Sequence, residues 1–475
     1  MDINENLMTQ YSLKPNIARN LSHSTKSVPM MEEITPRWLL TFLPWTAVES
    51  GIYRVNKLKE HYVTPGNVPF EAYEDLTIHP KHLHRIPPFR YIDPSLIDSV
   101  VPLFEKEEYN PGKAVTNSEN EGNKFFIVAK GQVEVSTLGH RGKKLIVSIL
   151  SDGDHSNIDA FMQKSNRYIG VRALTPCVLF SLERTAFENW INQSSQLREN
   201  FNNALHKWEN ERANANKHGE KLINLHSGHL GENTAPHTFP DYEEYPREYI
   251  LSYVQTILRV NTQVSDIFNI PIDQLHEQMR LTIEAMKEKQ EWEMINNRDF
   301  GLLNAVAPSM KVQTKKGMPT PDDMDELLAR VWKKPAFFLA HPKAIAAFTR
   351  ECTRRGVPPK TVNFYGSPFV TWRGVPLIPS DKLPIKGDSS RQSRCGTTSI
   401  LLMRVGEGEQ GVIGLHQPGI PDEKHSPSLS VKFGGIDNTG ITSYILSLYF
   451  SVAVLTNDAL GMLEDVEVGY YHDYE

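Results

Sequence analysis

Residues 124–138 read KFFIVAKGQVEVSTL, and this stretch decides the fold of the middle of the chain. A continuous apolar run, FFIVA, precedes Gly131, and apolar and polar residues alternate after it; Gly131 itself is typical of a tight turn. Two more stretches of strand type follow at residues 143–150 and 168–182, and Gly153 marks a turn between them. Short strands with turns at such regular spacing predict a small antiparallel barrel or β-roll.

Helical segments are expected on both sides of this roll. Residues 94–104 form a short one, and from residue 184 to about 216 apolar residues recur at helical spacing. Further out, residues 61–95 and 214–246 are polar and rich in His, Pro and Gly. We interpret these two stretches as linkers. The roll, over residues 96–213, is therefore predicted to be an inserted domain.

The stretch that follows the second linker, residues 247–475, has α+β character. Apolar residues at helical spacing predict a first helix over residues 248–268, and a second is expected over about 281–294. Thr320 is a good N-cap for a third helix. A fourth helix begins at Pro342 and ends near Gly356. The remaining segments read as strands and turns.

The N-terminal part of the chain divides at residue 37. Residues 1–37 are polar and carry four Lys/Arg and four Asp/Glu, which predicts an extended arm that orders against a partner. Residues 38–60 begin with an apolar cluster and continue with mixed apolar and polar positions around Gly51. This pattern favours a turn and a strand, as one limb of a hairpin.

Composition limits the classes of function. The 475 residues suffice for roughly three ordinary domains. With 51 Lys+Arg against 57 Asp+Glu, the net charge of −6 argues against nucleic-acid partners and against binding to an anionic membrane. Three widely spaced cysteines make no CxxC pair, which suits a reducing compartment. The most apolar run, residues 444–455, is shorter than the ~20 residues of a membrane helix, and no targeting signal is visible. We therefore expect a cytoplasmic protein.

A search for catalytic patterns finds none. GxSxG, the P-loop pattern and HExxH are all missing from the sequence. The histidines of residues 79–84 match no standard zinc spacing, and they fit a polar linker better. Cys395 lies in a polar loop sequence with no recognisable base beside it. The sequence therefore predicts no catalytic residue and no metal site, and the chain is not expected to be an enzyme.

The roll resembles a cyclic-nucleotide-binding domain. The resemblance is carried by KGQVEVS around Gly131, by LSDGD with Gly153 and Asp154, and by Arg167 ahead of the strand sequence YIGVRALTPCVLFSL. In that family backbone N–H groups and one arginine hold the cyclic phosphate, and the glutamate of a Phe-Gly-Glu motif binds the ribose. The resemblance gives Arg167 the phosphate role, which suits a guanidinium and oriented amides on an anion.

The pocket motif of this family is not fully present here. Ser156, Asn157 and Ile158 stand where the family has Phe-Gly-Glu. The acid for the ribose is replaced by Ile158, or is supplied by Asp159 after a slip of one residue. Two interpretations follow: the roll binds cAMP or another cyclic nucleotide, or it is kept as a structural or docking module. The candidate nucleotide-binding residues are Gly153, Asp154, Asp159 and Arg167.

Long stretches outside the roll resemble the shell proteins of family 2 encapsulins, which have the HK97 phage-capsid fold. They are residues 43–56, 245–269, 333–359 and the run from VGEGEQG at residue 405 to VEVG at residue 469. Together they cover most of residues 30–60 and 245–475. The inserted roll matches subfamily 2B, which carries a cyclic-nucleotide-binding-like domain. The implied fold class is α+β, an HK97 capsid-like fold with an inserted antiparallel β-roll.

This resemblance implies self-assembly into a closed icosahedral shell, with T = 1 geometry and sixty subunits, located in the cytoplasm as a nanocompartment. It also implies a cargo enzyme with a disordered targeting segment, in this subfamily often a terpene cyclase or else a polyprenyl transferase. Whether the shell contains one or two kinds of shell protein is left open, as are the residues that line its pores.

Two other functions were compared with the shell. A cyclic-nucleotide-responsive regulator would form a small oligomer, and its helical body would be the effector. A hydrolase or transferase in residues 247–475 would need catalytic residues that the sequence does not display. The size of the particle in solution separates the shell from both alternatives.

Overall fold

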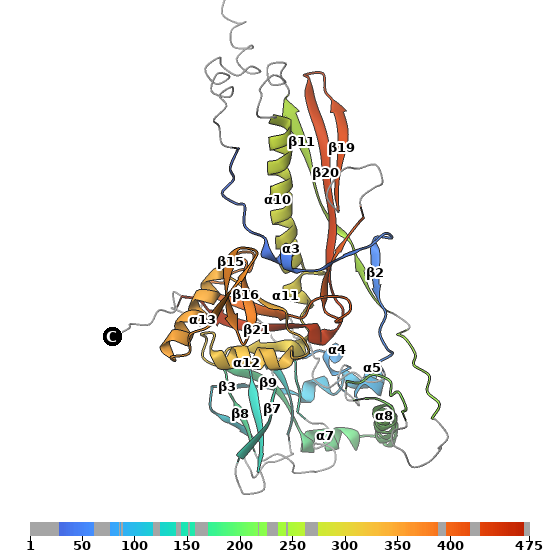
Figure 1. The fold of residues 1–475 in the computed structure, drawn as a ribbon. Helices are drawn as coiled ribbons and strands as arrows, with labels where there is room; N and C mark the ends of the chain where they lie inside the picture. Colours follow the sequence, from blue (N-terminus) through green and yellow to red (C-terminus); the bar gives the residue numbers. More distant parts are fainter. Residues whose placement is uncertain are drawn as a thin grey trace, which may run out of the picture.

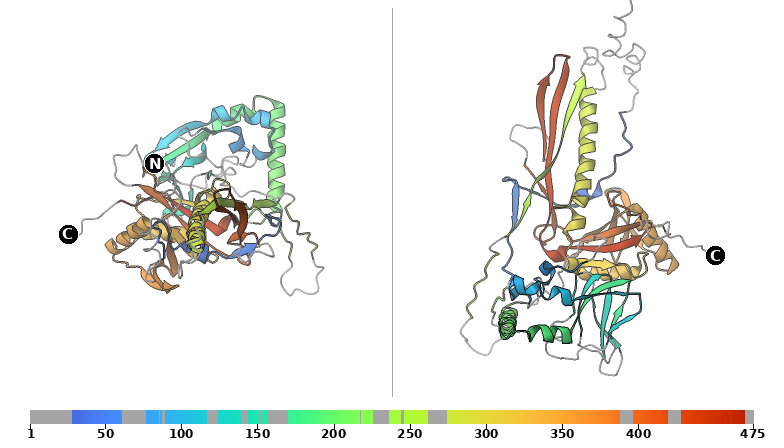
Figure 2. Two further views of the ribbon diagram at one scale, coloured as in Figure 1. Left: turned by 90° about the horizontal axis from the view of Figure 1, so that it is seen from above. Right: turned by 180° about the vertical axis from the view of Figure 1, so that it is seen from behind.

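The computed structural model describes residues 28–60, 77–84, 86, 89–116, 124–138, 144–150, 153–156, 170–216, 218–225, 236–243, 246–261, 274–387, 396–418 and 428–469. Three parts are visible in Figure 1. An extension, built on helix α10 (Gln274–Asn296) and strand β20 (Ile441–Val454), reaches away from a central body. The roll lies on the opposite side of that body, and Figure 2 shows the same arrangement from behind.

The body is a mixed sheet of seven strands with two helices, α12 (Pro321–Arg330) and α13 (Pro342–Arg354). Its central strand β13 is buried at every residue, which explains its unbroken apolar sequence FFLA. The strands, in spatial order, are β12 (Lys311–Gln313), β21 (Leu460–Glu467), β17 (Thr397–Met403), β13 (Phe337–Ala340), β16 (Val375–Pro379), β15 (Ser367–Trp372) and β14 (Lys360–Phe364).

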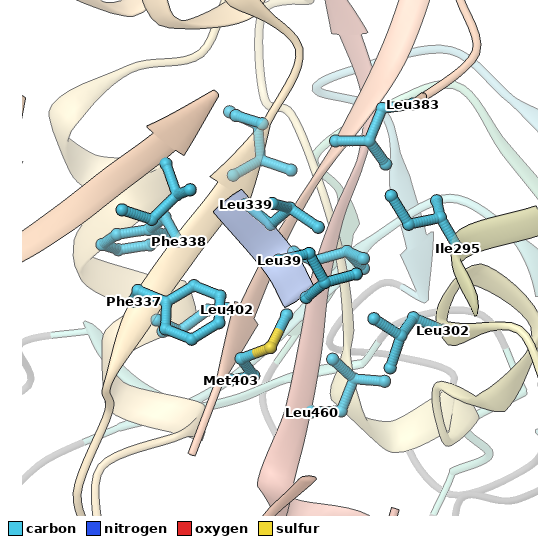
Figure 3. Packing of buried hydrophobic residues seen from close by; sticks show 14 of the residues in the cluster. Leu39, Ile295, Leu302, Phe337, Phe338, Leu339, Leu383, Leu402, Met403 and Leu460 are labelled. Carbon is cyan, nitrogen blue, oxygen red and sulfur yellow. The ribbon is translucent and has the colours of Figure 1, made fainter. Parts of the chain in front are cut away.

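The core of the body joins elements from distant parts of the sequence. Figure 3 shows Leu39 from the N-terminal region and Ile295 of α10 beside Leu339 of β13 and Leu402 of β17. All four side chains are fully buried. The short elements around this core are α11 (Leu302–Ala305), η3 (Pro308–Met310) and η4 (Asn457–Ala459).

The helix ends of the body follow their local sequence signals. The Thr320 hydroxyl accepts the N–H of Asp323 at 3.3 Å, and the Asp323 carboxylate accepts the N–H of Thr320 at 3.0 Å. This capping box begins α12 as predicted. The predicted fourth helix is also confirmed, since α13 begins at Pro342 and Gly356 follows its end with a φ of +69°.

The extension is a sheet with α10 against it. Strand β20 is its longest member, with β18 and β19 paired to it, and β18 is paired in turn with β1 in parallel. Helix α10 was expected over residues 281–294 and is longer, because its first turns lie along the sheet of the extension. The other strands are β1 (Trp45–Ala47), β11 (Ser252–Asn261), β18 (Val412–His416) and β19 (Leu429–Ile436).

The helix predicted over residues 248–268 is wrong. Residues 247–250 form β10 (Arg247–Ile250), residues 252–261 form β11, and residues 262–273 lie outside the described residues. Strand β11 pairs with β20 in antiparallel register over its whole length. Both faces of this strand carry apolar residues, such as the exposed Ile257 and the half-buried Leu258. Apolar positions therefore fall at helical spacing by coincidence, and pairing along β20 decides the conformation.

The region after the N-terminal arm also differs from the prediction. The segment expected as turn or strand forms a short helix, α3 (Trp38–Phe42). The helical conformation places Leu39, from its apolar cluster, in the core of the body. The strand expected next is present as β1 and β2 (Ile52–Val55). Residues 1–27 of the predicted arm lie outside the described residues.

The predicted roll is present as two antiparallel sheets. One contains β3 (Glu105–Tyr109), β9 (Cys177–Glu183) and β5 (Lys124–Lys130); the other contains β4 (Ala114–Thr116), β8 (Gly170–Ala173), β6 (Val133–Leu138) and β7 (Lys144–Leu150). Its helical elements are α4 (Pro80–Leu83), η1 (Phe89–Tyr91), α5 (Pro94–Ile97), η2 (Val101–Leu103), α7 (Arg184–Ile191) and α8 (Ser195–Ala213).

Part of the stretch predicted as a linker, residues 61–95, is folded. Residues 61–76 lie outside the described residues, but Leu83, Ile86 and Phe89 are buried in one cluster with Phe125 and Trp190 of the roll. The high content of His and Pro hid this, since single apolar residues in short helical turns produce no periodic pattern. The folded part around the roll therefore begins before residue 96.

The chain leaves and re-enters the body region through one narrow stem. Strand β2 pairs with β10 in antiparallel register, with Val55 opposite Arg247 and Ile52 opposite Ile250. Isolated bridges at Leu58–Tyr242 and Glu60–Glu220 continue this ladder toward the roll. We call this paired region, residues 52–60 with 218–221, 241–243 and 246–250, the stem. Both limbs of the stem thus stabilise each other between the roll and the rest of the chain.

Among the described residues, no helix is both long enough and apolar enough to cross a membrane. The most apolar run of the sequence, residues 444–455, is mostly strand β20, and its side chains are partly or fully buried.

Candidate functional site

The candidate nucleotide site lies where residues 153–156 run beside strand β5. The backbone N–H of Gly153 donates to the carbonyl oxygen of Val128 at 2.8 Å, and the N–H of Val128 donates to the carbonyl oxygen of Asp154 at 2.8 Å. Gly153 has a φ of +83°, a conformation that favours glycine. This short segment is therefore fixed to strand β5.

Only part of the predicted nucleotide site is described. Gly153 and Asp154 lie together beside strand β5, both hydrogen-bonded to Val128. Asp159 and Arg167, which were predicted to contact the ribose and the cyclic phosphate, lie outside the described residues. Their roles remain predictions.

His155, which the sequence did not single out, has its side chain buried in the roll. Its ring lies 5.6 Å from that of Phe125, centroid to centroid, and its Nδ1 lies 2.8 Å from the carbonyl oxygen of Ser156. Burial lowers the pKa of His155, against the opposing effect of this backbone contact. The imidazole is therefore neutral at pH 7 and supplies no positive charge for a phosphate. The backbone of His155 forms an isolated β-bridge with Ile127, and this pairing directs the His155 side chain inward. No sequence pattern indicates this bridge.

Gly131, which carries part of the resemblance, is required by the geometry of its turn. It has a φ of +101°, and a Cβ at this position would lie 2.5 Å from the carbonyl oxygen of Pro176. The neighbouring Gln132 N–H donates to the hydroxyl of Thr175 at 2.8 Å. The turn between β5 and β6 is thus tied to the turn between β8 and β9. Gly131 therefore has a structural role in the roll.

A polar cavity of about 880 Å³ lies between the stem and the body. At its edge the Tyr53 hydroxyl donates to Oε1 of Glu407 at 2.9 Å. Burial, together with Glu407, raises the pKa of Tyr53 to about 12, so the hydroxyl stays protonated. Both signs of charge line the cavity, which gives it no selectivity for a cation or an anion. The charged lining residues are Arg54, Lys57, Lys333, Glu60, Glu220, Glu407 and Asp458.

A buried ion-pair network fixes the loop beside this cavity. The Arg404 side chain is 2% exposed, and its Nη2 donates to Oδ1 of Asp458 and to the hydroxyl of Thr456, both at 2.8 Å. Lys333 Nζ lies 2.7 Å from Oδ2 of Asp458. Burial alone would raise the pKa of Asp458, but hydrogen bonds from Arg404, Lys333 and Thr456 hold it well below its usual range. The network has a structural role.

The extension exposes large apolar side chains. On β11, Tyr253 is 64% exposed and Ile257 is 60% exposed; on β19, Phe433 and Ile436 are exposed to a similar degree. Scattered apolar residues are ordinary on a protein surface, whereas groups on one projecting element mark contact surfaces. The extension is therefore a candidate surface for contact between protein molecules.

Within the described part of the chain, no group of three or more His, Cys, Asp or Glu residues could hold a metal ion. Cys177 and Cys352 are buried and free of disulfide bonds. Burial, and then the neighbouring Glu351, raises the pKa of Cys352 to about 11, so this thiol is a poor nucleophile. Cys395 lies outside the described residues.

Two family models match this chain. The model described as "Type 2A encapsulin shell protein SrpI-like" matches residues 208–470, which is more than half of the chain. The model for the cyclic nucleotide-binding domain matches residues 106–194, within the roll.

Individual proteins agree with the first match. The Type 2A encapsulin shell protein SrpI of Synechococcus elongatus is 59% identical over 243 residues, 51% of this chain and 76% of that protein. A Type 2A encapsulin shell protein of Mycolicibacterium paratuberculosis is 49% identical over 253 residues, 53% of this chain and 80% of that protein. The cryo-EM structure of the holo-SrpI encapsulin complex from Synechococcus elongatus PCC 7942 aligns with a TM-score of 0.54 at 36% identity, covering 98% of this chain and 99% of that chain.

These matches confirm the two resemblances predicted from sequence, to an encapsulin shell protein and to a cyclic-nucleotide-binding domain. The family description reads Type 2A, whereas the sequence prediction named subfamily 2B. The inserted domain is matched separately from the shell part of the chain.

Proposed function

The chain belongs to the SrpI-like family of Type 2A encapsulin shell proteins, and from this membership we propose that it assembles with copies of itself into a closed icosahedral shell. The family match over residues 208–470 is the observation that carries the proposal. The exposed apolar side chains of the extension support it, since contact with neighbouring copies would remove them from water.

The proposed shell domain has the HK97 phage-capsid-like fold and consists of residues 38–60 and 247–475, after an N-terminal arm of residues 1–37. The roll, residues 96–213, is the inserted domain between two linkers, 61–95 and 214–246. Pairing of β2 with β10, and of β1 with β18, supports one shell domain made from both sides of the insertion. The described turns before residue 96 extend the folded part of the insertion.

The proposed particle has T = 1 geometry with sixty subunits and is a cytoplasmic nanocompartment. It encloses a cargo enzyme with a disordered targeting segment, a terpene cyclase or a polyprenyl transferase, and the shell protein itself is not an enzyme. Its partners are copies of itself and the cargo, with no nucleic acid and no membrane. The net charge of −6 supports the last point.

Particle size tests the shell. Sixty copies of a 54.0 kDa chain give about 3.2 MDa, which size-exclusion chromatography with light scattering measures, and negative-stain images would contain uniform hollow particles. A variant Ile257→Glu places a charge on the exposed face of β11 and is expected to abolish the large particle. Ile257→Val, which keeps an apolar β-branched side chain, is the matched control and is expected to assemble.

A monodisperse dimer or tetramer would instead contradict the shell. It would favour the second candidate function, a cyclic-nucleotide-responsive regulator. The match of residues 106–194 to the cyclic-nucleotide-binding domain supports this alternative.

We further propose that the roll binds cAMP or another cyclic nucleotide through Gly153, Asp154, Asp159 and Arg167. Calorimetry on the full chain with cAMP, and separately with cGMP, tests this. Arg167→Ala removes the proposed phosphate contact and is expected to weaken binding by at least tenfold, as loss of a charge-assisted contact does. Lys164→Ala, a nearby lysine without this assigned role, is the control and is expected to bind normally. No heat with either nucleotide would leave the roll as a structural or docking module.

A further inference from the structure

The N-terminal segment, residues 28–42, is attached to helix α10 by side chains of that helix. Thr35 donates its backbone N–H to Oε1 of Glu288 at 2.7 Å, and Nη2 of Arg280 donates to the carbonyl oxygen of Pro29 at 2.8 Å. Arg37 forms ion pairs with Glu284 and Glu288. Figure 1 shows this segment, in blue, running along α10 before it enters α3.

Glu291 of α10 is the most deeply buried of these contacts. It is 1% exposed, and its Oε1 accepts the backbone N–H of Leu39 at 3.0 Å, in the first turn of α3. Leu39 itself is fully buried in the core of the body. The attachment of α3 to the body therefore depends on one carboxyl group that has almost no contact with water.

Charged groups from three elements surround Glu291. Helix α10 contributes Glu288, the loop after β16 contributes Asp381 and Lys382, and the N-terminal segment contributes Arg37, which is paired with Glu288. Lys382 Nζ lies 2.8 Å from both Glu288 and Asp381. Both cations are already paired, Arg37 with Glu284 and Glu288, and Lys382 with Glu288 and Asp381. An additional negative charge on Glu291 therefore lacks a dedicated cationic partner.

The electrostatic balance favours a proton on Glu291. Burial raises its pKa to about 7, reinforced by Glu288 and Asp381 and opposed by the Leu39 N–H and by Lys382. Its ordinary value is 4.5. A group with this shift is half protonated near neutral pH, so small changes of pH change its charge.

We propose that the N-terminal segment is a proton-controlled latch, closed when Glu291 is protonated and loosened when Glu291 ionises. When α3 separates from the body, water reaches the Glu291 carboxyl, which then ionises more readily. Glu291 therefore binds its proton more tightly in the closed form than in the open form. By linkage, the free energy that favours the closed form over the open form decreases as the pH rises from about 4.5 to about 7. Above about pH 7 this free energy changes little, because Glu291 is then ionised in both forms. This inference does not depend on the proposed nucleotide site or on the proposed shell.

Opening of the latch would also change a cavity. Leu40 and Trp45 form one side of a cavity of about 410 Å³, and Met286 of α10 forms part of the other. Because the segment supplies a wall of this cavity, loosening it exposes apolar surface to water. The closed and open states therefore differ in exposed apolar area as well as in charge.

Hydrogen–deuterium exchange on the full-length protein tests the latch. The peptide that contains Leu39 is followed by mass spectrometry from pH 5.5 to 8.5, and each rate is divided by the intrinsic exchange rate at that pH. In the wild type, the protection factor of this peptide is expected to fall about 30-fold between pH 5.5 and 8.5. This is the part of the total linkage effect that lies above pH 5.5, since the effect begins near pH 4.5. Most of the fall is expected below about pH 7.

Three variants separate the latch from general loosening. Glu291→Gln keeps an acceptor for Leu39 but has no charge, so its protection is expected to be independent of pH. Glu293→Gln, on the same helix and paired with Lys289 rather than with the segment, is the control and is expected to follow the wild type. Asp381→Asn removes an exposed negative neighbour, so the fall is expected at lower pH.

A protection factor that stays constant with pH in the wild type would overturn the proposal. An unchanged pH dependence in Glu291→Gln would overturn it too, because another group would then be titrating. If Glu291→Gln does not fold, the wild-type profile and the shift in Asp381→Asn still decide the question, since the Asp381 side chain lies at the surface.

Discussion

Replacing Arg404 by methionine should destabilise the body strongly, because the guanidinium holds a loop from the inside. Arg404 is fully buried at the end of β17 and donates to Asp458, Thr456 and the carbonyl oxygen of Gln410, at distances of 2.8 to 3.4 Å. Methionine has a similar length and fills most of the space, so the change removes the hydrogen bonds with little loss of volume.

The expected cost follows from what each acceptor loses. Asp458 keeps Lys333 and the Thr456 hydroxyl, which donates to it at 2.7 Å, so it is not left as an unpaired buried charge. The carbonyl oxygen of Gln410 lies 2.8 Å from the same Thr456 hydroxyl, whose single hydrogen serves one of the two acceptors at a time. Of the contacts that Arg404 loses, the two at 2.8 Å, to Asp458 and to the Thr456 hydroxyl, are the strongest. At about 1.5 kcal/mol for each such bond, the loss is about 3 kcal/mol, at the lower end for a broken buried pair.

Thermal unfolding of the full chain measures this loss. About 3 kcal/mol corresponds to a Tm lower by roughly 6–12 °C for a unit of this size. Arg373→Met is the control, since the Arg373 side chain is 64% exposed and an exposed ion pair contributes little to stability. Equal shifts for the two variants would refute the reasoning, because burial would then have no influence on the strength of the pair.

The pH dependence of the same pair gives a second measure. Asp458 has a lowered pKa in the folded protein, so its contribution is present above its ordinary pKa of 3.8 and is lost as the pH falls below that value. The difference between wild type and Arg404→Met should therefore shrink in acid. A difference that grows below pH 4 would contradict this sign.

Three further changes test the account of the fold. Gly131→Ala should destabilise the roll by more than about 2 kcal/mol, since the new Cβ would meet the Pro176 carbonyl at 2.5 Å, and loss of the roll's cooperative unfolding step would reveal it. Thr320→Ala removes the cap of α12 and should cost about 1 to 2 kcal/mol in denaturant unfolding. Leu339→Ala in the central strand should cost about 2 to 5 kcal/mol, whereas Leu225→Ala, at a position 84% exposed, should change the midpoint little.

The parts of the fold that the sequence predicted are those with local signals. Thr320 and the proline after it begin α12 because capping uses only neighbouring residues. The strands of the roll followed from an apolar run before Gly131 and from alternation after it, and the turn itself requires this glycine. The shell resemblance needed no such signal, because it rested on long matching stretches.

The parts that were missed depend on contacts distant in sequence. Strand β11 was predicted as a helix, since only its pairing with β20, some 190 residues later in the chain, distinguishes the two. Ile86 was assigned to a linker because nothing near it in the sequence indicates the core that buries it. In the candidate nucleotide site, the LSDGD pattern predicted Gly153 and Asp154, and their contact with a nucleotide stays a prediction. The inward position of His155 depends on a bridge to β5, which no local pattern indicates.

The stem has a consequence for how this chain can be rebuilt. Val55 and Arg247 lie opposite each other in an antiparallel pair, so the two ends of the whole insertion are about 5 Å apart, Cα to Cα. A different folded domain whose first and last residues lie equally close could be spliced at these positions without stretching either limb. The same geometry permits a tight reverse turn in its place, since antiparallel strands can be closed by two residues. The stem therefore predicts that the insertion can be exchanged as a unit at this pair of positions.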